Sequence, residues 1–254
     1  MQLNFSCNTG YLWKELPFLE RLNMAKRYNF DSLEFHAEPH NEDLTGLKNL
    51  IEDLQLPVNA MNAYMGDTFG CAAIAERNKV AQEQVEEAIA IADKIGSRSL
   101  HILSGIADNN SENLQAYLKT LQYALDNSDI TILIEPVCDE QLPGYFLRTI
   151  SQAAGVIKQI NHPRLKIMFD CYHIYRESGD LIKNFSAHVN YIGHVQIAAL
   201  AERAEPFPGV LDYSSILREF RALGYKGAFG CEYRPKSKTE DGLGWRKQFE
   251  LWDS

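Results

Sequence analysis

The chain has 254 residues, of which 45% are hydrophobic, so it carries enough apolar material for one sizeable core. Its 34 acidic and 25 basic residues give a formal net charge of −9, which argues against a surface built mainly to bind nucleic acid or anionic lipid. The first residues, MQLNFS, lack a basic segment followed by a long apolar run, and no apolar stretch approaches the ~20 residues that span a bilayer. We therefore expect a cytoplasmic protein that binds neither membrane nor nucleic acid.

Five cysteines are spread along the chain, and no two of them have the C-x-x-C spacing of a zinc or redox motif. An odd number in a chain of this size makes a disulfide framework improbable, so we expect reduced thiols.

Short apolar runs bounded by polar or turn residues predict the strands. Several of them, such as ITILI and LKIMF, are almost continuously apolar, which is typical of strands buried on both faces of a parallel sheet. The predicted strands are Leu3–Asn8, Ser32–His36, Pro57–Asn62, Ser99–Leu103, Ile130–Glu135, Leu165–Asp170, Tyr191–Ile197 and Gly227–Tyr233.

The stretches between these runs have the helical spacing of apolar residues. The clearest are Glu15–Tyr28, Ala75–Ile95 and Tyr213–Leu223, and Gly96 and Gly224 stand where a helix commonly ends. Eight strand–helix units of roughly 30 residues fill the chain, and that number favours closure of the sheet into a barrel. The sequence therefore predicts an α/β fold, a single (β/α)8 TIM barrel formed by one domain over residues 1–254.

The last four predicted strands end in oxygen-bearing side chains: Glu135, Asp170, Gln196 and Glu232. Their spacings of 35, 26 and 36 positions are each about one strand–helix unit, so these side chains should meet at the carboxyl-terminal rim of the barrel, where barrel enzymes place their active sites. Three converging carboxylates would repel one another, and a hard divalent cation such as Mg²⁺ or Mn²⁺ would offset that repulsion. The pattern predicts a metal centre at this rim.

Histidines and one more acid lie near the same rim. His173 follows Asp170 by three residues and should face the site, whereas His194 should lie one layer below Gln196 on the same strand face. His101 is expected to be a hydrogen-bonded interior residue. Glu34, near the end of the second strand, needs a partner if it is buried, and the site would supply one indirectly.

Several segments resemble the hydroxypyruvate isomerase family, one of the xylose isomerase-like barrels, and the likeness covers nearly the whole chain. The strongest are IEP at Ile134–Pro136, PGYFL at Pro143–Leu147, FDCYH at Phe169–His173, GHVQIA at Gly193–Ala198, GCEYRP at Gly230–Pro235 and TEDGLGW at Thr239–Trp245, with weaker support from LPFLERL at Leu16–Leu22 and MGDTFG at Met65–Gly70.

This resemblance implies a metal held by Glu135, Asp170, Gln196 and Glu232, with Glu135 and Glu232 as the acid–base pair, and it implies that His173 and Arg203 contact the substrate. It also implies a reaction: the isomerisation of a small 2-oxo acid through a cis-enediolate. The substrate would be hydroxypyruvate, which gives tartronate semialdehyde, or a 2-oxo-tetronate. Arg203 and Arg234 are the candidates for binding the substrate carboxylate.

Three loops depart from the family pattern. Ala204 replaces the histidine of an Arg-His-Glu-Pro segment, Val210 replaces a glutamate, and Val137–Asp139 replaces a Leu-Asn-Arg-like run. Because such loops shape the substrate pocket, a ketose 3-epimerase and an inosose-type dehydratase remain alternatives on the same metal site.

Two other classes stay open. One is a metal-dependent endonuclease acting at abasic sites, which the negative charge disfavours, and the other is a non-catalytic binding protein on an eroded barrel. A homo-oligomer is also possible, with Trp13, Phe69 and Trp245 as aromatic candidates for subunit contacts or for covering the pocket.

Overall fold

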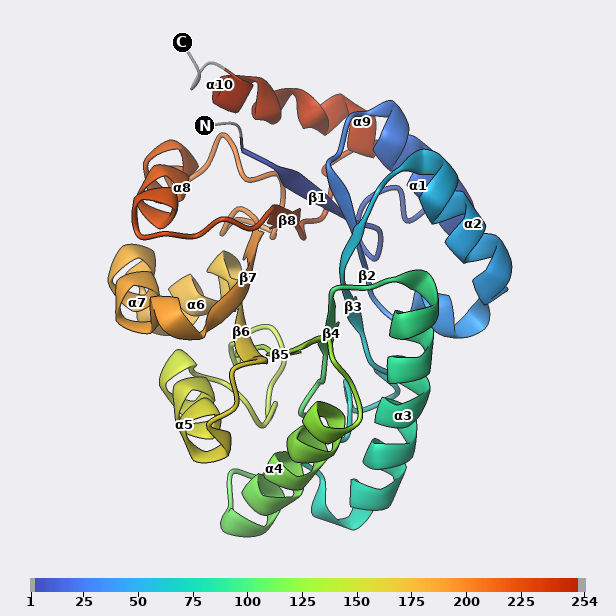
Figure 1. Cartoon of the computed structure of the whole chain (residues 1–254). Coiled ribbons are helices and arrows are strands. Elements are labelled where there is room, and N and C mark those ends of the chain that lie inside the picture. The colour runs from blue at the N-terminus through green and yellow to red at the C-terminus, as the bar shows by residue number, and fades with distance from the viewer. Residues whose placement is uncertain (1–2, 251–254) are drawn as a thin grey trace.

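The computed structural model describes residues 3–250, and within them eight parallel strands close into a barrel in chain order (Figure 1). The strands are β1 (Phe5–Asn8), β2 (Ser32–Phe35), β3 (Val58–Asn62), β4 (Ser99–His101), β5 (Thr131–Ile134), β6 (Leu165–Asp170), β7 (Ile192–Ile197) and β8 (Phe229–Cys231). β8 pairs with β1, so the sheet has no free edge. The predicted (β/α)8 barrel is confirmed.

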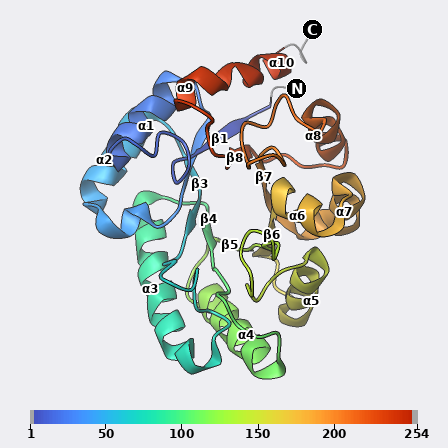
Figure 2. The ribbon, with the colours of Figure 1, turned by 180° about the vertical axis from the view of Figure 1, so that it is seen from behind.

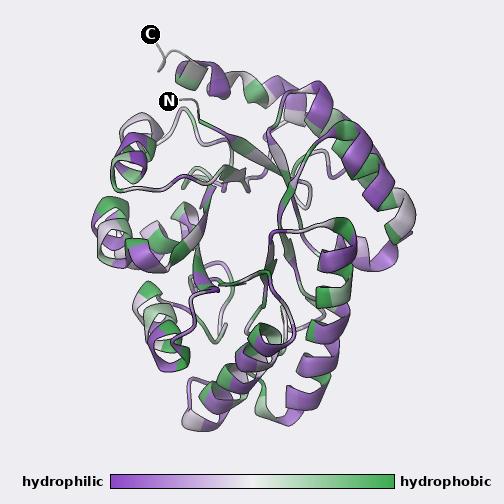
Figure 3. Ribbon diagram, viewed as in Figure 1, coloured by the Kyte–Doolittle hydropathy of each residue, from purple (hydrophilic) through white to green (hydrophobic). Residues whose placement is uncertain are grey.

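Helices form an outer ring around the strands, and the view from behind shows the same ring (Figures 1 and 2). They are α1 (Phe18–Arg27), α2 (Leu44–Leu54), α3 (Asn78–Ile95), α4 (Ser111–Asp126), α5 (Ile150–Ile160), α6 (Cys171–Ser178), α7 (Leu181–His188), α8 (Tyr213–Ala222), α9 (Thr239–Gly242) and α10 (Lys247–Glu250). Short 3₁₀ segments lie at Glu38–Asn41, Ala75–Arg77, Val189–Tyr191 and Leu243–Arg246. Hydrophilic and hydrophobic residues alternate along these helices, as expected for elements that cover a barrel (Figure 3).

The helix boundaries differ from the sequence prediction where local chemistry intervenes. α1 begins at Phe18 instead of Glu15, because Pro17 has an extended backbone (ψ 146°) and lacks the N–H of a helical residue. α3 ends as predicted, at Gly96, whose φ of 71° lies in the left-handed region that glycine adopts without strain.

The large hydrophobic core lies between the strands and the helices, where α7 and α8 meet through the stacked rings of Phe185 and Phe220 (3.9 Å between centroids). A second, small cluster is made by Ala60, Leu133 and Met168. Each of these residues stands two positions before a polar residue at or directly after the end of its strand, so strand alternation puts them on the same face, one layer deeper. The cluster therefore forms an apolar floor beneath the predicted site.

Trp13 and Trp245 are buried inside the chain and are not available for subunit contacts. Trp13 packs against Tyr28 and Phe30, and its indole N–H donates to Glu240, whereas Trp245 packs edge-on against Phe5 of β1. Phe69, in contrast, is 41% exposed. Two of the three aromatic candidates for oligomer contacts thus belong to the core.

All five cysteines lie in the described part of the chain, and they are free and buried, as the sequence predicts. Over residues 3–250, none of the helices combines the length and the apolar composition needed to cross a bilayer.

Candidate active site

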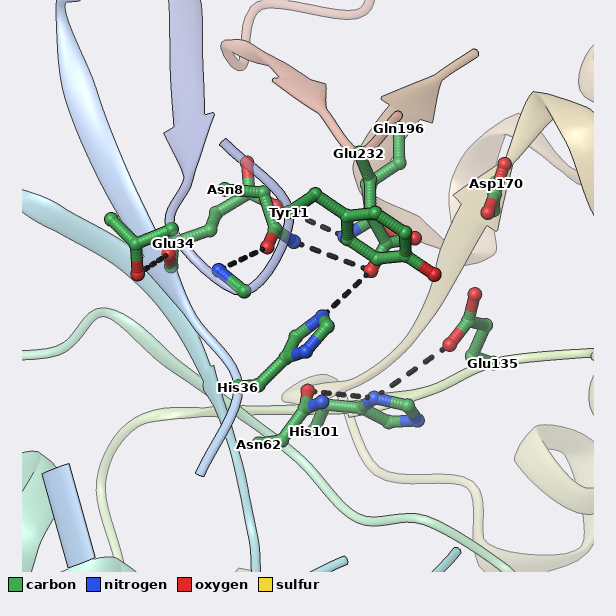
Figure 4. Close-up of polar contacts among 12 residues, drawn as sticks. Asn8, Tyr11, Glu34, His36, Asn62, His101, Glu135, Asp170, Gln196 and Glu232 are labelled. Atoms are coloured by element: carbon green, nitrogen blue, oxygen red, sulfur yellow. Dashed lines mark hydrogen bonds and ion pairs between the residues drawn. The ribbon is translucent and has the colours of Figure 1, made fainter. Parts of the chain in front are cut away.

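The four residues predicted to form the metal centre meet at the carboxyl-terminal end of the barrel (Figure 4). Asp170 ends β6 and pairs in register with Gln196 of β7, whereas Glu135 and Glu232 directly follow β5 and β8. All four residues are at most 7% exposed. The structure therefore brings the four residues to one rim of the barrel, as the strand-end pattern predicts.

A buried guanidinium lies among these carboxylates. Nη2 of Arg203 is 2.5 Å from Oδ2 of Asp170 and also pairs with Oε2 of Glu232, while Nη1 donates to the Tyr11 hydroxyl at 3.0 Å. The guanidinium also faces the rings of Tyr11 and Tyr172 at 5.1 and 5.2 Å from their centroids, within the range of cation–π attraction. Arg203 is thus the internal counter-charge of the site.

The loop after β7 brings Arg203 to this place through an unusual backbone. Glu202 and Arg203 have φ angles of 57° and 54°, in the left-handed region that residues with a side chain rarely adopt. Such conformations persist only when the surrounding contacts hold them. Here the ion pairs with two buried acids supply those contacts.

Glu232 is held on both carboxylate oxygens. Its Oε1 accepts from Nδ2 of Asn8 at 3.2 Å and lies 3.2 Å from Nε2 of His36 (Figure 4). Its Oε2 pairs with Arg203. The chain turns at Gly10 beside His36, and a Cβ at that glycine would lie 2.2 Å from Nδ1 of the imidazole. The loop after β1 therefore leaves room for His36 to reach Glu232.

Glu135 is held by longer contacts than Glu232. His101 and His173 approach its oxygens only to 3.8 Å, and among the described residues its buried Oε1 has no hydrogen-bond partner. Burial, followed by the neighbouring charges of Glu232 and Asp170, raises the pKa of Glu135 well above its usual range. A carboxyl in this position tends to hold its proton unless a cation comes close.

Asp170 is a fixed carboxylate. Its Oδ1 caps α6 by accepting from the backbone N–H of Tyr172 at 2.8 Å. Burial alone would raise its pKa, but Arg203 and this capping bond outweigh burial and hold the pKa of Asp170 below its usual value.

His173 faces the carboxylates in its neutral form. Its Nε2 lies 3.5 Å from Oδ2 of Asp170, and its Nδ1 lies 3.4 Å from the backbone N of Cys138. Burial lowers the pKa of His173 to about 3. Because Nδ1 receives the backbone N–H, Nε2 carries the ring hydrogen and points it at the acids.

Glu34 and His194 lie below Gln196. Oε2 of Glu34 accepts from Nε2 of Gln196 at 2.9 Å, and Oε1 pairs with Nε2 of His194, also at 2.9 Å. Burial by itself would raise the pKa of Glu34, but His194 and Gln196 together lower it. The expectations that His194 lies deeper than Gln196 and that Glu34 finds its partner through the site are both confirmed, and His101 is hydrogen-bonded inside the barrel, to Oδ1 of Asn62 at 3.0 Å.

The acids open onto a small cavity of about 110 Å³. This is well below the size of a drug-sized pocket and suits a ligand of a few heavy atoms. Its polar wall is formed by Tyr11, His36, Asn62, Glu135, Gln141, His173, Arg203 and Glu232, and its apolar wall includes Met65, Phe69, Leu103, Val137, Leu142 and Tyr145. Asp170 and Gln196 are not among the lining residues.

Sequence reasoning missed the site residues of the first three strands. Asn8 and Asn62 end β1 and β3, and His36 directly follows β2, so the strand-end rule that found Glu135 and Asp170 points to them as well. Of the two arginines considered for binding a substrate carboxylate, Arg203 lines the cavity, whereas Arg234 is exposed and is not among the lining residues.

The departures from the family pattern differ in their distance from the cavity. Val137 lines it, Cys138 contacts His173 through Sγ at 3.3 Å, and Ala204 is buried next to Arg203. Val210, in contrast, is 79% exposed and is not among the lining residues. Only the first three can affect what the cavity accepts by direct contact or packing.

Comparison with known proteins agrees with this geometry. A family model described as xylose isomerase-like TIM barrel matches residues 22–251. The chain is 34% identical to hydroxypyruvate isomerase of Escherichia coli, over 96% of this chain and 98% of that protein, and 32% identical to 2-oxo-tetronate isomerase of Cupriavidus necator, over 96% and 98%. A crystal structure described as AP endonuclease, family 2, from Brucella melitensis has a TM-score of 0.93 and 31% identity, covering 97% of this chain and 99% of that one. The expected resemblance is confirmed, and the chain belongs to the xylose isomerase-like TIM barrel family.

Proposed function

We propose that this protein is a metal-dependent isomerase of small 2-oxo acids, and that it moves a carbonyl group to the neighbouring hydroxyl-bearing carbon. The observation that carries the proposal is the pair Glu135 and Glu232, which line one small cavity beside a buried arginine. Relatives with this activity in their names support it: hydroxypyruvate isomerase and 2-oxo-tetronate isomerase. The cavity volume of about 110 Å³ fits substrates of three or four carbons better than larger sugars.

The residues at the barrel rim fit a divalent cation. Glu135, Asp170 and His173 each offer a ligand atom, and these atoms lie within 4.8 Å of one another. Among the residues that the structure describes, Oε1 of Glu135 and Oε1 of Gln196 are buried and have no hydrogen-bond partner, and buried oxygens of this kind need a donor or a cation. With Glu135, Asp170 and Glu232 ionised, Arg203 balances one of three negative charges and leaves two for a metal.

We assign the metal to Glu135, Asp170, Gln196 and Glu232, because carboxylate and amide oxygens are the ligands that Mg²⁺ and Mn²⁺ prefer. We assign His173 to the substrate instead of the metal, because the family resemblance implies that role and because it lines the cavity. When bound, the metal would act as a Lewis acid that stabilises negative charge on the substrate oxygens.

The chain's own groups then move one proton between adjacent carbons. With hydroxypyruvate, one of Glu135 and Glu232 takes a proton from C3, which leaves a cis-enediolate, and the other supplies a proton to C2. The former C3 hydroxyl oxygen becomes the aldehyde oxygen of tartronate semialdehyde as its own proton leaves, and the C2 oxygen gains one. Atoms and electrons balance without any further reactant.

Arg203 is the proposed contact for the substrate carboxylate. It is the arginine among the cavity-lining residues, and its Nε is buried without a partner in the described structure. A carboxylate in the cavity would use a donor that is already in place, because the ion pairs with Asp170 and Glu232 hold the guanidinium still.

The rival activities make different products. A ketose 3-epimerase would return the proton to the opposite face of the same carbon, and an inosose-type dehydratase would eliminate water. An endonuclease would need to admit a nucleic acid backbone, which a cavity of about 110 Å³ in a chain of net charge −9 does not favour.

The test is to load the purified protein with Mn²⁺, supply hydroxypyruvate and a 2-oxo-tetronate in turn, and identify the product by NMR. The proposal expects tartronate semialdehyde or the corresponding isomer. If epimers of a ketose or a dehydrated dione form instead, and neither 2-oxo acid is converted, the substrate class proposed here is wrong.

A further inference from the structure

The side-chain amide of Gln196 has its two ends in different surroundings. Its Nε2 donates to Oε2 of Glu34 at 2.9 Å, and its Oε1 is buried and has no partner in the described structure. An amide can offer either its oxygen or its NH₂ group in a given direction, and only the oxygen can bind a cation. The group that accepts the hydrogen bond from Nε2 therefore decides whether Gln196 presents its oxygen or its NH₂ group in the opposite direction.

Glu34 is the group that accepts this hydrogen bond. It is 1% exposed, lies 162 positions away in sequence, and comes from β2 across the barrel from β7. A carboxylate only accepts hydrogen bonds, so its presence excludes the flipped amide, in which two oxygens would face each other. Its other oxygen lies 2.9 Å from Nε2 of His194, and because a carboxylate only accepts hydrogen bonds, that nitrogen is expected to carry a hydrogen.

The neighbouring strand leaves space for this pair. Gly230 of β8 lies opposite Gln196 in the sheet register. A Cβ at Gly230 would lie 2.4 and 2.7 Å from the two oxygens of Glu34 and 2.8 Å from Cγ of Gln196. The φ of Gly230 is not in the left-handed region, so the requirement for glycine here is space for Glu34 and Gln196.

We propose that Glu34 is a positioning residue that fixes the amide orientation of Gln196, so that its oxygen faces the carboxylates Asp170 and Glu232. Glu34 is not among the residues that line the cavity, so we expect it to act through Gln196 and not on the substrate. The inference rests on the proposed function, because it takes Gln196 as a metal ligand.

The pair can be broken and rebuilt with isosteric substitutions. In Glu34→Gln, the new amide keeps its oxygen toward the N–H of His194 and turns its NH₂ toward Gln196, so Gln196 must flip and present NH₂ to the metal. In Gln196→Glu, two carboxylates face each other across 2.9 Å and repel. In the double variant, the amide at position 34 donates to the carboxylate at position 196. This restores a hydrogen bond between the two side chains and leaves the second oxygen of the carboxylate directed at the metal site.

The experiment is a titration of metal-stripped protein with Mn²⁺, followed by calorimetry or by the electron paramagnetic resonance of free Mn²⁺, on the wild type, both single variants and the double variant. Glu34→Gln should weaken Mn²⁺ binding about 10–100-fold in the wild-type background. In the Gln196→Glu background the same substitution should strengthen binding, by about tenfold.

This reversal of sign separates orientation from charge. If Glu34 acted only through its negative charge, its loss would weaken Mn²⁺ binding in both backgrounds, and that result would overturn the inference. Equal binding by the wild type and Glu34→Gln would also overturn it. If the wild type binds no Mn²⁺, the proposed metal centre fails first, and the inference falls with it for that separate reason.

A further variant and an NMR measurement test the inference if a Glu34 or Gln196 variant does not fold. Gly230→Ala keeps both partners but crowds them, and it should weaken Mn²⁺ binding in the same direction as Glu34→Gln. In the metal-free wild type, the ¹⁵N side-chain resonance of Gln196 should show NH₂ protons protected from exchange. Rapid exchange of these protons, or unchanged Mn²⁺ affinity in a folded Gly230→Ala variant, would contradict the proposed role of Glu34.

Discussion

The two halves of the barrel contribute different chemistry to the same rim. Glu135, Asp170, Gln196 and Glu232 lie at or directly after the ends of strands β5 to β8, whereas β1 to β4 and the residues just after them supply the amides and imidazoles Asn8, His36, Asn62 and His101. The second half therefore carries the three carboxylates at the rim, whereas the first half supplies amides and imidazoles that contact them, together with the deeper acid Glu34.

Groups of the first half hold side chains of the second half in place. Asn8, from the adjacent strand β1, and His36, which follows β2, contact one oxygen of Glu232, and Glu34 of β2 accepts a hydrogen bond from Gln196 of β7. Glu135 is the exception, since its nearest nitrogen neighbours, His101 and His173, stay at 3.8 Å. Of the two glutamates, one is anchored by the opposite half and the other is left free to change its protonation.

The largest effect is expected at the acid–base pair. Glu232→Gln keeps the shape of the side chain but removes a group that takes or gives the proton, so the turnover of the metal-loaded enzyme should fall about 10²–10⁴-fold. Glu140→Gln, at an exposed carboxylate paired with Arg176, is the matched control and should leave turnover unchanged. A Glu232→Gln enzyme with more than about a tenth of wild-type turnover would remove Glu232 from the reaction.

The next effect concerns the buried charge balance. Asp170→Asn leaves Arg203 with one fewer carboxylate, and breaking a buried ion pair typically lowers the free energy of unfolding by about 3 kcal/mol. The helix cap at α6 should survive, because asparagine also caps helices. Urea unfolding of the metal-free protein measures the change.

Asp180→Asn provides its control, since Asp180 caps α7 at an exposed position by accepting from the backbone N–H of Lys183. That variant should lie within about 0.5 kcal/mol of the wild type. Equal stability of the two variants would mean that the ion pair between Arg203 and Asp170 contributes nothing.

A third prediction uses the raised pKa of Glu135. The folded state holds this proton more tightly than the unfolded state, whose pKa is near 4.5. The free energy of unfolding of the metal-free protein should therefore fall as the pH rises above that value. Each unit by which the pKa is raised corresponds to about 1.4 kcal/mol. Between pH 5 and pH 8, the Tm of the metal-free wild type should therefore fall more with rising pH than the Tm of Glu135→Gln.

Metal binding should reverse this trend, since a cation favours the ionised carboxylate. The rise in Tm on adding Mn²⁺ should grow with pH in the wild type. Parallel pH profiles for the wild type and Glu135→Gln would show that Glu135 does not titrate in this range.

The smallest effect is expected in the first half of the barrel. His36→Ala removes one hydrogen bond to Oε1 of Glu232 and leaves Asn8 and Arg203 in place, so turnover should fall only about tenfold. Steady-state kinetics with saturating metal measures this. A loss as large as that of Glu232→Gln would mean that His36 itself takes part in proton transfer and that the division between the two halves is wrong.

Much of the fold and the centre of the site could be predicted from strand periodicity. The ends of β5 to β8 point to Glu135, Asp170, Gln196 and Glu232, and alternation along β7 places His194 below Gln196. The same rule applied to β1 and β3 would have found Asn8 and Asn62.

Other features depend on contacts that no local pattern contains. The resemblance pointed to Arg203, but its place between Asp170 and Glu232 depends on a loop with two left-handed residues. The pairing of Glu34 with Gln196 joins residues 162 positions apart, and it becomes visible only when the barrel is closed.

The central claim is that the carboxylates of the second half hold a divalent metal and isomerise a 2-oxo acid. The most direct measurement is one ¹H NMR time course of hydroxypyruvate with the purified protein, first loaded with Mg²⁺, then treated with a chelator, then supplied with Mg²⁺ again. The account predicts tartronate semialdehyde in the first and last phases and none in between. Conversion that continues unchanged through chelation would contradict the metal centre, and no conversion in any phase, with a 2-oxo-tetronate equally inert, would contradict the proposed reaction.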